Sequence, residues 1–87
     1  MIHGYPPIAR ETGIEGTVLI SLIIEPDGFI SKVKLEKDIG GGCGQAVLAA
    51  LQMETINRSK WIPALKDGKP VRSIVYYPQI FRLEKKK

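Results

Sequence analysis

An 87-residue chain is long enough for one domain with a single hydrophobic core and too short for a second domain. Its 44% hydrophobic and 25% charged residues are typical of a globular protein and exclude a disordered, collagen-like or coiled-coil chain. One cysteine and one histidine supply neither an internal disulfide nor a zinc-ligand set, so we expect no metal and no cofactor.

The chain is modestly basic. Thirteen basic and nine acidic residues give a net charge of +4, and the basic residues are dispersed except for Lys85–Lys87. Because this charge is small beside that of dedicated nucleic-acid binders, we expect no nucleic-acid partner. No apolar run approaches the roughly 18 residues that span a bilayer, and the start lacks a signal-peptide pattern. We expect residues 1–4 and 84–87 to be disordered ends of a single domain, with any membrane anchor upstream.

The first predicted element is a short helix over Pro7–Thr12. Two prolines set an extended entry and the first helical position, and Gly13 allows the left-handed residue that ends a helix. So short a helix does not persist alone. We therefore expect Ile8, Ala9 and Tyr5 to pack onto a larger body.

Residues 16–25 form the clearest predicted strand. Its even positions form an unbroken apolar face: Val18, Ile20, Leu22 and Ile24. Its other face is also largely apolar: Thr17, Leu19, Ser21 and Ile23. A strand that is apolar on both sides belongs in the middle of a sheet.

A turn and a second strand follow. Glu25–Gly28 carries proline and glycine at the positions of a tight turn, which predicts a hairpin into a strand over Phe29–Lys37. Lys32 and Lys34 place charge on one side of this strand, as is typical of an outer edge.

Three consecutive glycines within Asp38–Gly42 predict a corner. They lack the Gly-Lys-Ser/Thr ending of a phosphate-binding loop, so we interpret them as a link into a helix over Cys43–Asn57. The apolar residues expected to face the sheet are Cys43, Ala46, Val47, Ala50, Met53 and Ile56, with Leu48 and Leu51 beside them. Cys43 is interpreted as a core residue, because the only histidine, His3, lies near the chain start.

The last predicted strand runs from Val71 to Leu83, after a turn over Lys66–Pro70 and with Trp61 closing one end of the core. Its β-branched and aromatic residues favour a strand, but Pro78 lacks the N–H that a strand between two neighbours requires. We therefore place it at an edge. Gln79 falls among the inward-facing positions, which predicts a bulge at Pro78.

Together these elements predict an α+β domain: a three-stranded antiparallel sheet with one main helix packed on one face and a short N-terminal helix. Residues 16–25 take the middle position. We find no Ser/His/Asp set, no paired carboxylates in a predicted cleft and no metal cluster, so we expect a binding domain and not an enzyme. An exposed strand edge is either protected or pairs with a partner strand.

Taken together, the motifs resemble the C-terminal domain of TonB, the energy transducer of Gram-negative envelopes. The matching motifs cover nearly the whole chain: Tyr5-Pro6 with Ala9-Arg10 and Gly13, Gly16-Thr17-Val18, Pro26-Asp27-Gly28 with Ile30, Trp61-Ile62-Pro63-Ala64, and Asp67-Gly68-Lys69-Pro70-Val71. The insertion Gly40–Cys43 resembles the Bacteroidetes branch. The departures are Gln79, where the family usually has an apolar residue, and the long polar helix end Gln52–Lys60.

The resemblance implies a periplasmic domain of an inner-membrane-anchored protein, linked through a missing N-terminal region to a proton-driven motor complex. The implied partners are outer-membrane transporters, whose extended TonB box pairs with the last strand during uptake of siderophores, vitamins or glycans. Carried onto this sequence, the pairing residues and their neighbours are Val71, Arg72, Ser73, Ile74, Val75, Tyr76, Tyr77, Tyr5 and Pro6. We expect Pro78-Gln79 to limit the pairing.

Two other functions stay open on the sequence. The exposed edge can serve self-association into a homodimer. The same domain can also belong to another envelope protein, such as a sensor or a membrane-bound peptidase, and recognise something other than a transporter.

Overall fold

The computed structural model describes residues 5–83. The expected disordered ends, residues 1–4 and 84–87, and His3 lie outside this range. The described elements are α1 (Pro7–Thr12), β1 (Gly16–Ile24), β2 (Ile30–Lys37), α2 (Cys43–Ile56), β3 (Ala64–Lys66), β4 (Lys69–Val71) and β5 (Ser73–Phe81). Within residues 5–83, no helix has the length and apolar character needed to cross a membrane.

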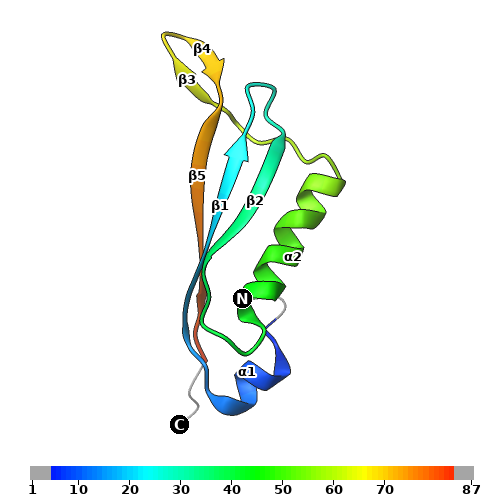
Figure 1. The fold of residues 1–87 in the computed structure, drawn as a ribbon, viewed down its shortest axis with the longest axis vertical. Coiled ribbons are helices and arrows are strands. Elements are labelled where there is room, and N and C mark those ends of the chain that lie inside the picture. Colours follow the sequence, from blue (N-terminus) through cyan, green and yellow to red (C-terminus); the bar gives the residue numbers. More distant parts are fainter. Residues whose placement is uncertain (1–4, 84–87) are drawn as a thin grey trace.

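The main sheet is antiparallel with the strand order β2-β1-β5. Figure 1 shows α2 lying across one face of this sheet and α1 at one end, so the predicted α+β architecture and the central position of β1 are confirmed. The molecule is elongated, at 51 × 23 × 20 Å. The main sheet runs along this long axis, and a small β3–β4 hairpin projects beyond it at one end (Figure 1).

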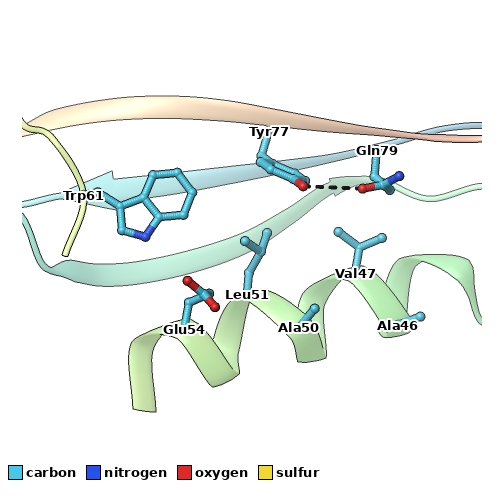
Figure 2. A pocket seen from close by; sticks show the side chains of 8 residues that line it. All are labelled: Ala46, Val47, Ala50, Leu51, Glu54, Trp61, Tyr77 and Gln79. Atoms are coloured by element: carbon cyan, nitrogen blue, oxygen red, sulfur yellow. Dashed lines mark hydrogen bonds between the residues drawn. The ribbon is translucent and has the colours of Figure 1, made fainter. Parts of the chain in front are cut away.

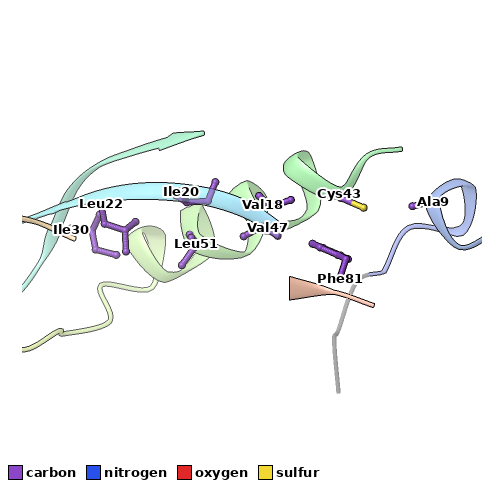
Figure 3. Close-up of a cluster of buried hydrophobic side chains, with 9 residues drawn as sticks. All are labelled: Ala9, Val18, Ile20, Leu22, Ile30, Cys43, Val47, Leu51 and Phe81. Atoms are coloured by element: carbon purple, nitrogen blue, oxygen red, sulfur yellow. The ribbon is translucent and has the colours of Figure 1, made fainter. Parts of the chain in front are cut away.

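The core lies between β1 and α2. The four apolar even positions of β1, from Val18 to Ile24, are all buried, as the alternation predicted. Cys43, Val47 and Leu51 of α2 and Phe81 of β5 complete the core with Ala9 and Ile30 (Figure 3). Burial raises the pKa of the Cys43 thiol, which favours the core interpretation of this residue over a nucleophilic one. Trp61 is half-buried and packs against the same cluster.

The predicted apolar stripe of α2 was wrong in its second half. Met53 and Ile56 are 51% and 70% exposed, whereas the buried residues follow a spacing of four along Cys43, Val47 and Leu51. Met53 and Ile56 lie off that stripe, since at about 100° per residue they are roughly 200° and 140° around the helix from Leu51. Ile8 is also exposed, so α1 packs through Ala9 and not through Ile8.

The glycine corner is organised by Asp38. Its Oδ1 atom accepts hydrogen bonds from the backbone N–H groups of Ile39, Gly40 and Gly44 at 2.7, 3.0 and 3.0 Å. These bonds, led by that of Gly40, lower the pKa of the Asp38 carboxyl group. A Cβ on Gly44 would lie 2.5 Å from the Asp38 carboxyl carbon, which accounts for the glycine there. The amides of this corner thus already bind an anionic group of the chain itself.

The predicted strand Val71–Leu83 is divided into two. Val71 pairs with Ala64 in the β3–β4 hairpin, whose turn has Asp67 at φ 51° and Gly68 at φ 78°. The chain then leaves this hairpin at Arg72 and enters the main sheet at Ser73. The prediction of one continuous strand was wrong because Val71 is already paired with a segment that the sequence alone does not place beside it.

The predicted bulge at Pro78 was also wrong. The pairing of β5 with β1 is unbroken over nine positions, from Gly16 opposite Phe81 to Ile24 opposite Ser73. The irregularities fall instead between β1 and β2, at Leu19/Ile20 and Ile23/Ile24.

Candidate partner-binding edge

β5 forms an edge of the main sheet because, within residues 5–83, its only neighbour in that sheet is β1. None of its nine residues, Ser73 to Phe81, is charged. Ile74, Tyr76 and Ile80 are 61%, 59% and 54% exposed on the face of the sheet opposite α2. An uncharged, apolar edge strand carries unpaired backbone groups that can pair with another chain.

Pro78 fixes which backbone groups of β5 face outward. Leu19 lies opposite Pro78 within the unbroken pairing, and proline has no N–H to donate. This pair is therefore of the type without direct hydrogen bonds, and the pairs beside it, which include Tyr77 and Gln79, are the hydrogen-bonded ones. Odd-numbered residues of β5 bind β1, and even-numbered residues turn their N–H and C=O groups to the free edge.

The outward donors of β5 therefore belong to Ile74, Tyr76 and Ile80, with a gap at Pro78, which offers only its C=O group. The edge thus lacks one donor at Pro78, and the limit of partner pairing at Pro78-Gln79 stays a prediction.

One end of β5 is held by Arg72. Its Nε atom donates to Oε1 of Glu25 at 2.9 Å, and the Ser31 hydroxyl donates to Oε2 of the same carboxylate at 2.6 Å. The Ser31 bond first, and then Arg72, lower the pKa of the Glu25 carboxyl group. Arg72 thus ties the start of β5 to the β1–β2 hairpin and is not free at the edge.

The other end of β5 is covered by Tyr5. The Tyr5 hydroxyl donates to the backbone oxygen of Ile14 at 2.6 Å, and its ring meets that of Phe81 edge-on at 5.1 Å. Burial, more than the nearby Glu15, raises the pKa of Tyr5. Pro6 is the N-cap residue of α1.

The structure thus divides the expected site. Val71 and Arg72 precede β5, and Tyr5 packs at Phe81, roughly 30 Å away at about 3.4 Å per residue. Ser73, Ile74, Val75, Tyr76 and Tyr77 lie on β5 between these ends. The free edge of β5 connects them.

A groove of about 310 Å³ lies beside this edge, and the sequence interpretation missed it as a site. α2 packs on β1 and β2, which leaves the α2-facing side of β5 partly uncovered. Figure 2 shows the lining residues: Ala46, Val47, Ala50, Leu51 and Glu54 from α2, Tyr77 and Gln79 from β5, and Trp61 at one end. The signals for it were Gln79, an amide among inward-facing residues, and the single tryptophan. The Tyr77 hydroxyl donates to the Gln79 amide oxygen at 3.4 Å.

The fold and this edge define a class of protein: a small α+β domain whose sheet offers one uncharged, unpaired strand edge beside a groove. The chain matches the family described as Gram-negative bacterial TonB protein C-terminal over residues 3–83. The chain therefore belongs to this family, and the resemblance seen in its motifs is confirmed.

The chain is also similar to Protein TonB of Vibrio cholerae serotype O1 (strain ATCC 39315 / El Tor Inaba N16961), with 32% identity over 80 residues. That match covers 92% of this chain and 31% of the relative, so the chain spans about a third of the relative's length. No solved structure gives a significant match.

Proposed function

We propose that this is the periplasmic domain of a TonB-type energy transducer, anchored upstream in the inner membrane. It captures the extended TonB box of outer-membrane transporters by adding it as a strand to β5. The observation that carries this proposal is the free edge of β5, which is uncharged over Ser73–Phe81 and has outward donors at Ile74, Tyr76 and Ile80. Membership of the TonB C-terminal family supports it.

Strand addition gives a reversible complex. Each main-chain hydrogen bond contributes about 0.5–1.5 kcal/mol net, so about five of them contribute roughly 2.5–7.5 kcal/mol, and side-chain contacts have to offset the cost of association to give a weak, reversible affinity. Such an affinity suits a transducer that binds and releases its transporters repeatedly.

The proposed energy transfer is mechanical. A partner strand pulled along its own axis loads several hydrogen bonds of β5 together, so a complex of modest affinity resists a pull. The proton-driven motor complex supplies that pull through the upstream region, and the transporter uses it for nutrient uptake. A proline in the pairing segment of the partner peptide should lower the rupture force in single-molecule pulling. An unchanged force would contradict this mechanism.

The binding step is tested by amide NMR titration of the domain with a synthetic TonB-box peptide. The largest shifts are expected along Ser73–Phe81, with smaller ones near Trp61 and Tyr5. Shifts that avoid β5 while appearing on β2 would overturn the proposal.

A second candidate function is self-association through the same edge, which the exposed apolar side chains of Ile74, Tyr76 and Ile80 favour. Sedimentation equilibrium over a concentration series distinguishes the two. A domain that stays monomeric and binds the peptide supports capture. A stable dimer that excludes the peptide supports self-association in this or another envelope protein.

A further inference from the structure

We propose that the groove between α2 and β5 selects the partner strand by its side chains. The preferred segment carries an apolar residue and, two positions along, a basic residue. This inference rests on the proposed strand addition and specifies the chemistry of the partner. The groove, of about 310 Å³, is at the small end of ligand sites, which suits side chains better than a separate small molecule.

The position of the groove follows from the gap between α2 and β5. Residues directly opposite each other in a strand pair place their side chains on the same face of the sheet. A partner residue opposite Tyr77 therefore projects into the groove, and so does the residue two positions away, about 6.8 Å along the strand. Strand addition thus delivers alternate side chains of the partner to the groove lining.

The middle of the groove fits an apolar side chain. Ala46 and Ala50 form a shallow wall on α2, and the ring of Tyr77 faces them from β5 (Figure 2). Short alanine side chains leave space that a partner residue can fill, and filling it removes apolar surface from water.

The Trp61 end of the groove fits a basic side chain. The Glu54 carboxylate lines this end and forms no ion pair within residues 5–83. It lies in the last turn of α2, where the negative pole of the helix also favours a cation. The Trp61 ring adds a face for a cation–π contact.

The nearest basic residues along the chain have another contact. The Arg58 guanidinium lies 4.3 Å from the centre of the Phe29 ring, and the Lys60 ammonium lies 6.0 Å from it. Both cations are placed on Phe29 and leave the Glu54 carboxylate to a partner.

The test uses seven-residue acetylated, amidated peptides of threonine and valine with two guest positions separated by one threonine. The guest pairs are valine with lysine, valine with glutamate, and alanine with lysine, each in both orders along the peptide. Binding is followed by the fluorescence of Trp61, the only tryptophan, and by amide shifts of β5. The valine–lysine peptide should bind about fivefold more tightly than the valine–glutamate peptide. It should also bind about fivefold more tightly than the alanine–lysine peptide.

Two variants locate these preferences. Glu54→Lys should reverse the preference for lysine over glutamate. Ala50→Leu, which fills the groove, should bring the ratio of valine to alanine affinities close to one. Ala49→Leu is the matched control, because Ala49 is exposed on the same helix and does not line the groove. It should leave both preferences unchanged.

A TonB-box peptide separates failure of this inference from failure of the proposed function. One outcome is that the TonB-box peptide changes the amide shifts of β5 while the guest peptides fail to bind or all bind with equal affinity. In that case the side-chain selection is wrong and strand addition stands. A lysine preference that survives Glu54→Lys has the same meaning. If neither the TonB-box peptide nor any guest peptide shifts β5, the proposed function and the inference are both overturned.

Discussion

The two edges of the main sheet differ in charge and in exposed apolar surface. β2 carries four charged residues: Lys32, Lys34, Glu36 and Lys37. β5 carries none, and three of its apolar side chains are more than half exposed. Charge on an edge strand discourages pairing with other chains. One sheet thus has a protected edge and an edge that is available to a partner.

The difference shows that exposure of an edge does not by itself indicate binding. Within residues 5–83, both strands have an unpaired side and a neighbouring groove, but Lys32 of β2 lines the groove beside that edge, whereas none of the residues of β5 is charged. Pro78 reduces the number of hydrogen bonds that the β5 edge can offer, because it lacks one outward donor without disturbing the pairing with β1.

Tyr76→Pro should weaken TonB-box binding about tenfold. It removes an outward donor and leaves a partner carbonyl unpaired, which costs about 1–3 kcal/mol, while the bonds of β5 to β1 are kept. Calorimetric titration measures the affinity, and amide NMR of β1 checks the fold. Tyr76→Thr is the control, since it shortens the side chain but keeps the N–H. Equal losses in both variants would show that the ring and not the backbone carries the binding.

Pro78→Val should tighten TonB-box binding about fivefold, because it restores the missing outward donor and one hydrogen bond of about 1 kcal/mol. The same titration measures it. Sedimentation should show more self-association as the edge becomes continuous. Weaker binding with an intact fold would mean that Pro78 does not face the free edge as the register requires.

Lys32→Thr combined with Lys34→Thr removes the charges that discourage pairing at the β2 edge. The self-association constant should rise about twofold to fivefold. Sedimentation equilibrium at constant ionic strength measures the change. The matched control is Lys66→Thr combined with Lys69→Thr in the β3–β4 hairpin, which removes the same charge away from the sheet edge. Equal association of both double variants would show that net charge, and not edge protection, is responsible.

The smallest effect concerns the Arg72–Glu25 link. The pKa of Glu25 lies below its usual 4.5, so the link contributes stability above pH 4.5 and loses it as the pH falls through the lower, folded value. Carboxyl NMR should therefore show Glu25 titrating below 4.5. Ser31→Ala and Arg72→Ala should each raise this pKa, because the Ser31 bond, the Arg72 bond and the Arg72 charge all lower it. An unchanged pKa in either variant would contradict the geometry at this end of β5.

Features set by near neighbours in the chain were predictable from the sequence. The period-two pattern of β1 gave its buried face, and Asp67-Gly68 indicated the turn between β3 and β4. Pro78 correctly indicated that β5 is an edge strand. A proline has no N–H to donate, so a strand that contains it is found at the edge of a sheet whatever its register.

Features set by tertiary placement were not predictable in the same way. Val71 is held by Ala64, so the last strand begins two residues later than its composition indicated. Met53 and Ile56 are exposed because the sheet contacts the stripe of Cys43, Val47 and Leu51, and the sequence of α2 does not show which of its apolar stripes faces the sheet. The groove depends on the same placement, since Glu54 and Tyr77 belong to elements that meet only in the folded domain.

Hydrogen exchange at single amides tests most directly whether β5 captures a partner strand. In the free domain, the amides of Val75, Tyr77 and Gln79 should already exchange slowly, because they bind β1. Adding the TonB-box peptide should slow Ile74, Tyr76 and Ile80 and leave the amides of β2 unchanged. Slowing on β2, or no change at the three outward amides of β5 under saturating peptide, would contradict capture at this edge.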